Sequence, residues 1–314
     1  MDERIIAQRA PGVEHTLLAL RRRLGVPALV LDGGFATELE RRGVPLDARL
    51  WSARAIVERP GVVSSIHSDY LAAGAHVLST ATYQASLQLL SDAGLDGPTV
   101  LRAGVRLARD ARDSAGVDAR VAASMGPYGA QLGDGSEYRG DYAVTDRELV
   151  DFHLGQSEAL WEAGPDLLAF ETVPSLREAG CIVRALEALG SPPAWISFSL
   201  RDPGHVSAGD PVAASLSQVA RYVGAVGLNC APPSRIAEAL DRVGALEAEL
   251  LVYPNSGELW SGSARLWSGV AGGLGSWAER FRRAGATGIG GCCRTTPADI
   301  AAIRRALTLD PGSR

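Results

Sequence analysis

The segment Gly290-Gly291-Cys292-Cys293-Arg294-Thr295-Thr296-Pro297 joins the end of an apolar run to the start of a helix. The run before it has the character of a short strand that spans residues 287–292. Thr296 is a suitable N-cap, Pro297 suits the first helical position, and Asp299 stands three residues after the cap. The segment therefore predicts a strand, a loop that carries two adjacent thiols, and a helix.

The same strand–loop–helix pattern recurs along the whole chain. Eight apolar runs have the length of strands, and several are continuously apolar, which is typical of parallel strands buried on both faces. They span residues 28–32, 76–81, 120–125, 166–171, 194–200, 225–230, 249–253 and 287–292. Amphipathic stretches fill the gaps, for example around residues 62–71 and 149–161.

Eight such units without a break in composition predict an α/β fold, a single (β/α)8 TIM barrel over residues 1–314. The first ~25 residues add an N-terminal extra helix, and we expect the tail after Leu309 to fray. A doubly wound open sheet is the alternative. It is less favoured because eight strands are many for it, and no Gly-x-Gly-x-x-Gly follows an early strand.

The composition indicates which classes of partner the chain can bind. The 314 residues are 46% hydrophobic and 21% charged, with a net charge of -5, which is ordinary for a soluble globular protein. The acidic balance gives no support for a nucleic-acid partner, and we interpret Arg21-Arg22-Arg23 as a solvated helix face. No apolar run approaches the ~20 residues of a membrane span, and no signal-peptide core is present. We therefore expect a cytoplasmic protein with small-molecule substrates; the oligomeric state stays open.

Three cysteines are placed to meet. Cys230 ends the run Val226-Gly227-Leu228-Asn229-Cys230, as Cys292 and Cys293 end the last one, and carboxyl ends of barrel strands share one face. Three thiolates can hold zinc with one position open, which is the arrangement of a catalytic site. Both adjacent cysteines can face one ion only if the backbone turns, which Gly290 and Gly291 permit. Incidental thiols or a vicinal disulfide remain alternatives, and Cys181 is interpreted as a small apolar residue of a helix.

Other polar residues follow strand ends and should ring the same mouth. They are Asp32, Tyr83, Glu171, Asn229 and Asn255. Asp32 before Gly33 could be a simple turn residue, whereas a carboxylate such as Glu171 after an apolar strand is costly unless it is paired or lies in a cleft. Two long loops, 126–145 and 254–275, are expected to act as lids or binding elements. No histidine has a partner at ligand spacing, and Ser256 is not in a nucleophile elbow.

These segments carry a resemblance to a known family. The chain resembles the homocysteine S-methyltransferases, particularly the bacterial and plant type that uses S-methylmethionine, over nearly its whole length. The matching segments are residues 31–39, 126–129, 134–142, 253–258, 290–295 and 296–300. The resemblance implies a (β/α)8 barrel and places the zinc ligands of the family on Cys230, Cys292 and Cys293. It also places homocysteine-binding positions on Asp32, Gly33 and Glu171, and an aromatic pocket residue on Tyr83.

The resemblance further implies that Glu171 binds the homocysteine ammonium and that Asp32 shapes the amino-acid pocket. Betaine-type relatives carry a tyrosine directly after that glutamate, whereas Thr172 stands here, so water or another donor should be the resting fourth ligand. Asn229 and Asn255 complete the expected substrate-binding set.

The expected reaction follows from thiol chemistry. Zinc deprotonates a bound thiol, so homocysteine becomes a thiolate without a dedicated base. An anionic sulfur shell favours a cationic donor, and Tyr83, Tyr128 and Trp260 could offer aromatic faces to a sulfonium. Methyl transfer from S-methylmethionine, or S-adenosylmethionine, would then give methionine. Another donor, selenocysteine as acceptor, or a non-catalytic zinc-binding protein are the alternatives; a fourth protein ligand would indicate the last.

Overall fold

Eight parallel strands form the central sheet of the computed structural model, which describes residues 16–46, 50–261, 266–268 and 272–308; residues 259–261 and 266–268 are described as backbone only. In spatial order the strands are β1 (Leu29–Val30), β12 (Gly288–Ile289), β9 (Glu249–Tyr253), β8 (Ala225–Asn229), β5 (Ala194–Phe198), β4 (Leu167–Val173), β3 (Arg120–Met125) and β2 (Val77–Ser79).

The two outer strands of this order meet and close the barrel. Leu31 pairs with Val77 in a parallel bridge. The His76 amide donates to the Val30 carbonyl at 2.7 Å, and the Asp32 amide donates to the Val77 carbonyl at 3.1 Å. Because the sheet has no free edge here, the (β/α)8 prediction is confirmed and the open doubly wound sheet is wrong.

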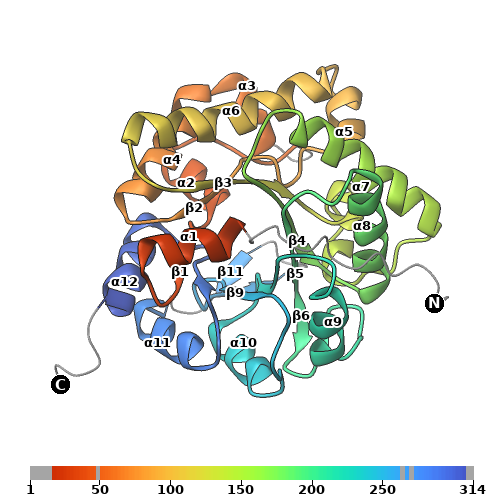
Figure 1. Ribbon diagram of the computed structural model, residues 1–314. Helices are drawn as coiled ribbons and strands as arrows, with labels where there is room; N and C mark the ends of the chain where they lie inside the picture. Colours follow the sequence, from red (N-terminus) through yellow and green to blue (C-terminus); the bar gives the residue numbers. More distant parts are fainter. Residues whose placement is uncertain (1–15, 47–49, 262–265, 269–271, 309–314) are drawn as a thin grey trace.

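Helices surround this barrel (Figure 1). They are α2 (Phe35–Arg41), α3 (Ala53–Glu58), α4 (Pro60–Ala72), α5 (Leu87–Asp92), α6 (Gly97–Ala115), α7 (Asp146–Trp161), α8 (Leu176–Ala188), α9 (Val212–Val219), α10 (Pro233–Leu240), α11 (Gly275–Arg283) and α12 (Pro297–Thr308). Loop 126–145 carries two 3₁₀ turns, η1 (Tyr128–Leu132) and η2 (Ser136–Tyr138). Antiparallel hairpins are formed by β6 (Leu200–Asp202) with β7 (His205–Val206) and by β10 (Leu259–Ser261) with β11 (Leu266–Ser268). No helix in these ranges is long and apolar enough to cross a membrane.

Several predicted strand ends need correction. The runs 28–32 and 76–81 shorten to β1 and β2, which end at Val30 and Ser79. The run 194–200 is not one strand, because β5 ends at Phe198 and Leu200 begins the β6–β7 hairpin. The run 166–171 continues as β4 to Val173, through an irregular register after Phe170. The last strand stops early, at Ile289, so that Gly290 and Gly291 belong to the loop that carries the cysteines. Helix α12 begins at Pro297 as predicted.

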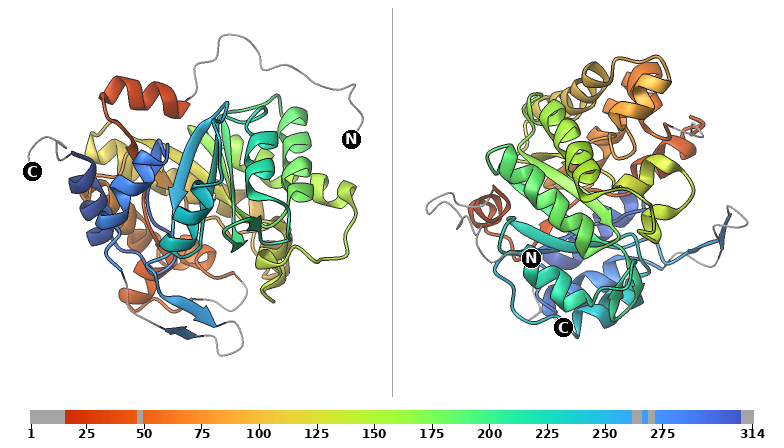
Figure 2. Two further views of the ribbon diagram at one scale, coloured as in Figure 1. Left: turned by 90° about the horizontal axis from the view of Figure 1, so that it is seen from below. Right: turned by 90° about the vertical axis from the view of Figure 1, so that its right-hand side faces the viewer.

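Helix α1 (Thr16–Leu24) closes the amino-terminal end of the barrel. Leu17 and Leu20 are buried in one cluster with the interior side chains of the strands, among them Leu29, Leu167, Trp195 and Leu251. Figure 2 (left) shows α1 and the β10–β11 hairpin at opposite ends of the molecule. The other end of the barrel is therefore the one left for a site. The expected fraying after Leu309 falls outside the described residues.

Charged residues of α1 dock it onto the barrel. Arg21 forms an ion pair with Glu249 at the start of β9, at 3.0 Å, and Arg23 pairs with Asp118 before β3. Arg22 and Arg23 are exposed, as expected of a solvated helix face, whereas Arg21 is half-buried against Glu249. The side chains of Arg21 and Arg23 orient the helix, while burial of the leucines supplies most of the stabilisation.

Replacing the leucine of α1 that is fully buried should destabilise the fold. We expect Leu20→Ala to lower the free energy of unfolding by ~2–5 kcal/mol, because it leaves a cavity against the barrel interior. Urea denaturation followed by circular dichroism measures this. Val57→Ala is the control, since Val57 is 47% exposed. A loss below about 1 kcal/mol for Leu20→Ala would show that α1 does not seal the barrel.

Candidate metal centre and substrate pocket

Backbone turns bring the three cysteines together at the carboxyl end of the barrel. Cys230 follows β8 and adopts a left-handed conformation, with φ of 51°. Cys292 begins a tight turn, in which the Thr295 amide donates to the Cys292 carbonyl at 3.2 Å and Arg294 has φ of 65°. A positive φ at the third residue is the mark of a type II turn. The turn allows two adjacent cysteines to face one point. It is formed at Cys293 and Arg294, after Gly290 and Gly291, and neither of these glycines has a positive φ.

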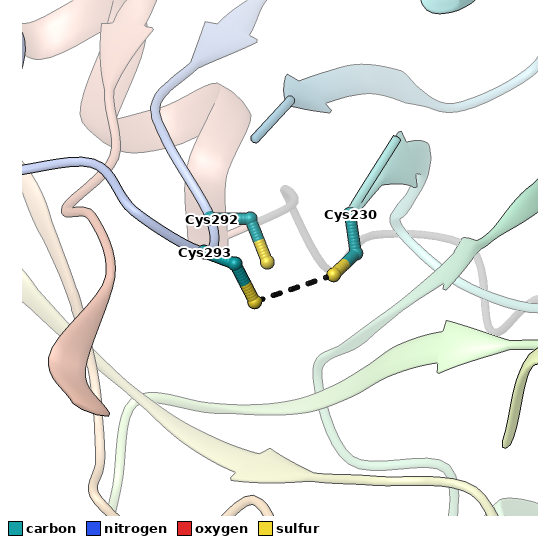
Figure 3. Close-up of side chains that lie close together, drawn as sticks. All are labelled: Cys230, Cys292 and Cys293. Atoms are coloured by element: carbon teal, nitrogen blue, oxygen red, sulfur yellow. Dashed lines mark hydrogen bonds between the residues drawn. The ribbon is translucent and has the colours of Figure 1, made fainter. Parts of the chain in front are cut away.

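The three sulfur atoms are spaced as a metal site requires. The Sγ atoms of Cys230 and Cys293 are 3.6 Å apart, and all three lie within 4.8 Å of one another (Figure 3). Sulfur atoms bound at 2.3 Å to a tetrahedral zinc would be about 3.8 Å apart. All four cysteines of the chain are free, so the alternative of a vicinal disulfide is wrong. The thiol set therefore fits zinc, with no fourth His, Cys, Asp or Glu in the group among the described residues.

Close contact between the three thiols gives them different pKa values. The pKa of Cys230 is well below the usual range because the thiols of Cys292 and Cys293 donate hydrogen bonds to its sulfur. The same contacts raise the pKa of Cys292 and Cys293. The first proton thus leaves from Cys230, and a divalent cation would compensate the charge that further deprotonation creates.

A glycine provides the space for the Cys292 turn. A Cβ atom at Gly34 would lie 2.6 Å from the Cys292 carbonyl oxygen, which is closer than real Cβ contacts. The Gly34 amide also donates to Thr295 Oγ1 at 3.0 Å, and Thr295 Oγ1 donates to the Cys292 carbonyl at 2.7 Å. The first βα loop thus fixes the last one, which explains the need for glycine after Asp32 and Gly33.

Asn229 links the Cys292 side of the site to β4. Its amide nitrogen donates to Thr172 Oγ1 at 2.8 Å and lies 4.0 Å from Cys292 Sγ, and its Oδ1 accepts from the Thr172 amide at 3.0 Å. Thr172 is β-branched yet has φ of 63°, a strained conformation. These two hydrogen bonds stabilise the backbone conformation of Thr172 and engage both polar atoms of the Asn229 side chain.

Two buried carboxyl groups lie at the bottom of the pocket. Asp32 Oδ2 accepts from the Ser79 amide at 2.6 Å, and burial raises the pKa of Asp32 well above its usual range. Glu171 accepts a hydrogen bond from the Ser124 hydroxyl, and burial raises the pKa of Glu171 to about 7. No cation pairs with either group within the described residues. Such groups are suited to a positively charged ligand.

The cysteines and these carboxyl groups share one cavity of about 1170 Å³. Its lining includes every site residue that the sequence predicted: Asp32, Gly33, Tyr83, Glu171, Asn229, Cys230, Asn255, Cys292 and Cys293. The ring of Tyr83 meets Trp51 edge-on at 6.3 Å, which gives the cavity an aromatic wall. Asn255 Oδ1 is buried without a hydrogen-bond partner in the described part of the chain.

Loop 126–145 covers the cysteine cluster. The Tyr138 hydroxyl of η2 lies 3.1 Å from Cys230 Sγ, and the neighbouring Glu137 also lines the cavity. The loop is anchored at its other end by Glu178 of α8, which accepts from the Tyr128 amide at 2.6 Å and from the Tyr142 hydroxyl. The loop thus joins a buried anchor to the thiols.

Sequence comparison assigns the family. The homocysteine S-methyltransferase family profile matches residues 29–307. A Bacillus subtilis protein named homocysteine S-methyltransferase YbgG is 42% identical over 294 residues, which cover 88% of this chain and 93% of that protein. A maize protein named homocysteine S-methyltransferase 2 is 41% identical over 310 residues, 91% of each chain. The chain belongs to the homocysteine S-methyltransferase family.

A solved structure extends the likeness to the fold. The metallated form of the homocysteine methyltransferase MmuM from Escherichia coli superposes with a TM-score of 0.82 at 40% identity, covering 91% of this chain and 99% of that one. The resemblance drawn from the sequence motifs is therefore confirmed, and the protein is a methyltransferase.

Of the three aromatic residues expected to face the donor, only Tyr83 lines the cavity among the described side chains. Tyr128 does not line the cavity; its ring packs against Tyr142 and Phe152, at centroid distances of 5.2 and 5.1 Å. The side chain of Trp260 lies outside the described residues. Trp51 takes the place expected of Tyr128 as a second aromatic wall beside Tyr83.

Sequence reasoning missed several residues that the site uses. Trp51, Ser124, Glu137 and Tyr138 all line the cavity. Ser124 lies inside a predicted strand, one residue before its end, and this position at the barrel mouth could have pointed to it. Glu137 and Tyr138 lie in an irregular loop, where no periodicity indicates which side chains face inward.

The loop anchor should make stability depend on pH. Burial raises the pKa of Glu178 to about 8 and lowers the pKa of His153, 3.0 Å from it, to about 3, so both are uncharged near neutrality. Because the folded-state pKa of Glu178 lies above its ordinary 4.5, its contribution to stability is full below 4.5 and is lost as pH rises towards 8.

Between pH 5.5 and 8, we expect the free energy of unfolding to fall less for Glu178→Gln than for wild type, by an amount on the order of a few kcal/mol. Urea denaturation at each pH measures it, with Glu158→Gln on the exposed side of α7 as the control. The other buried carboxyl groups leave some pH dependence in the variant. Parallel profiles for wild type and Glu178→Gln would contradict the assignment.

Proposed function

We propose that this protein transfers a methyl group from S-methylmethionine to the sulfur of homocysteine, with zinc held by Cys230, Cys292 and Cys293. The observation that carries the proposal is the convergence of three free thiols, within 4.8 Å, on a cavity lined by unpaired carboxyl groups. Membership of the homocysteine S-methyltransferase family supports the reaction class. A zinc ion bound there would supply an open position at which a substrate thiol is held as thiolate.

The carboxyl groups bind the amino-acid part of homocysteine in this proposal. Glu171, held by the Ser124 hydroxyl, accepts the substrate ammonium, and Asp32, held by the Ser79 amide, shapes the pocket beside it. An approaching cation stabilises the carboxylate form of Glu171, so its proton leaves on binding. The ammonium is thereby held at a fixed distance from the thiols, which positions the acceptor sulfur.

The electrostatics of the cavity favour a sulfonium donor. The thiols and carboxyl groups provide negative charge, and Tyr83 and Trp51 provide aromatic faces, on which a cation gains ~0.5–2 kcal/mol. In the reaction the bond between the donor sulfur and its methyl carbon breaks while the new carbon–sulfur bond forms. The donor leaves as a neutral thioether, methionine, and the homocysteine thiolate becomes the second methionine. Tyr138 and its loop shield the thiols from bulk water.

The alternatives differ in how they use this cavity. A closed structural zinc site is disfavoured, because no fourth His, Cys, Asp or Glu joins the three cysteines within the described ranges. S-adenosylmethionine as donor and selenocysteine as acceptor would use the same thiols and carboxyl groups, and about 1170 Å³ is large enough for either. We place the protein in the cytoplasm, where a reducing environment keeps the thiols able to bind metal.

Loss of one thiol should remove the metal without unfolding the chain. We expect about one zinc per wild-type chain, and for Cys292→Ser a zinc content below a tenth of that with at least 100-fold lower activity. Metal analysis after reducing purification measures the first, and methionine formation the second. Cys181→Ser, in α8 and away from the cavity, is the control and should keep both. Full activity of Cys292→Ser would disprove the proposed centre.

A panel of methyl donors tests the reaction itself. With homocysteine as acceptor, we expect S-methylmethionine to give the highest kcat/KM, S-adenosylmethionine a lower one, and betaine the lowest. Betaine should be poor because its leaving group is an amine rather than a thioether. Methionine is quantified with and without a chelator, which should abolish the reaction. Preference for betaine, or full activity after complete removal of metal, would overturn the proposal.

A further inference from the structure

Glu137 is a carboxylate that the cysteine site does not explain. It lies in η2 and lines the cavity, and its Oε2 is buried without a hydrogen-bond partner. No other residue in the described part of the chain donates a hydrogen bond to this carboxylate. Arg139, two residues on, forms ion pairs with Asp141 at 3.1 Å and Asp134 at 3.7 Å instead. The buried Oε2 atom of Glu137 thus lacks a hydrogen-bond donor, and a ligand in the cavity can supply one.

Its place in the fold is fixed by the backbone around it. A Cβ atom at Gly129 would lie 2.5 Å from the Glu137 amide nitrogen, so η1 and η2 are in direct contact. The Gly140 amide donates to the Ser136 carbonyl at 2.7 Å, and the Tyr138 hydroxyl reaches Cys230. Residues on both sides of Glu137 are therefore held, and its side chain belongs to the cavity wall rather than to a solvated loop.

Two carboxyl groups from different elements thus approach the same thiol. Glu171 comes from β4 and Glu137 from the loop above. Both line the cavity that holds Cys230, and Tyr138, the residue next to Glu137, reaches Cys230 Sγ at 3.1 Å. The aromatic residue Tyr83 lines the same cavity as Glu137. The proposed reaction brings two amino acids to one sulfur cluster. One has its ammonium at Glu171, and the second carboxylate lies on the side of the aromatic wall.

We propose that Glu137 binds the α-ammonium of the methyl donor and so selects donors that are sulfonium amino acids. A carboxylate can accept hydrogen bonds from an ammonium, whereas a trialkylsulfonium has no N–H or O–H to donate. The sulfonium itself is left to Tyr83 and Trp51, with its methyl directed at the thiols. This inference rests on the proposed function and adds the donor-binding residue to it.

Glu137→Gln tests the assignment. We expect the KM for S-methylmethionine to rise at least tenfold, while the KM for homocysteine and the zinc content stay within twofold of wild type. Calorimetric titration with S-methylmethionine should show a matching loss of affinity. Asp141→Asn, a charge removal at an exposed position of the same loop, is the control and should change neither KM by more than twofold.

An amine-free sulfonium separates hydrogen bonding from general charge attraction. Dimethylsulfonioacetate lacks the ammonium, so its inhibition constant or KM should be the same, within threefold, for wild type and Glu137→Gln. The thermal midpoint of the ligand-free variant should not fall, since the buried Oε2 of Glu137 makes no hydrogen bond that the substitution would remove. A lower midpoint together with weaker binding of every ligand would indicate a structural role and overturn the inference.

The outcomes also separate this inference from the proposed function. If wild type uses no sulfonium amino acid, the proposed function fails. If wild type uses S-methylmethionine and Glu137→Gln has an unchanged KM and affinity for it, only the role of Glu137 fails. If dimethylsulfonioacetate binds too weakly to measure, the role of Glu137 is decided by whether Glu137→Gln raises the KM for S-methylmethionine while the KM for homocysteine stays the same.

Discussion

The sulfur contacts of Cys230, Cys292 and Cys293 depend on backbone conformations that ordinary residues avoid. Cys230, Arg294 and Thr172 have positive φ at the carboxyl ends of three different strands. Each such residue costs on the order of 1–3 kcal/mol. The closed barrel offsets this cost with a continuous core on both faces of the sheet and with α1 sealing one end. Of the five described non-glycine residues with positive φ, three therefore lie around the thiols; Trp51 and Ser191 are the others.

The mouth of the barrel gathers carboxyl and thiol groups, whereas Arg139 and Arg294, which also line it, pair with Asp141 and Glu258. Asp32, Glu171 and Glu137 all have raised pKa values, for which burial is the first cause, and three thiols lie among them. Binding of a metal ion and of ammonium or sulfonium ligands would stabilise the charged forms of these groups, because a cation favours the charged form of an acidic neighbour. Metal and substrate affinities should therefore support one another.

Sequence reasoning succeeded where periodicity and strand ends decide position. The eight strands, the Cys230, Cys292 and Cys293 cluster, and Asp32 and Glu171 in one cavity all follow from the rule that barrel strands end at a shared face. It failed where loop tertiary structure decides. Nothing local shows that Tyr128 packs against Phe152 while Tyr138 reaches a thiol, because both lie in irregular 3₁₀ turns. Likewise, Glu178 anchors this loop from a helix some 50 residues away.

The functional groups of loop 126–145 are held in place differently from those at the strand ends. The strand-end groups are fixed by the sheet, whereas Glu137 and Tyr138 are fixed by the Glu178 anchor and by the Tyr138 contact with Cys230. The Tyr138 hydroxyl can donate to a thiolate, so this contact is compatible with Cys230 as a metal ligand. The side of the cavity proposed for the donor therefore depends on two contacts of one loop, whereas Asp32 and Glu171, which are proposed to bind homocysteine, are held by the barrel itself.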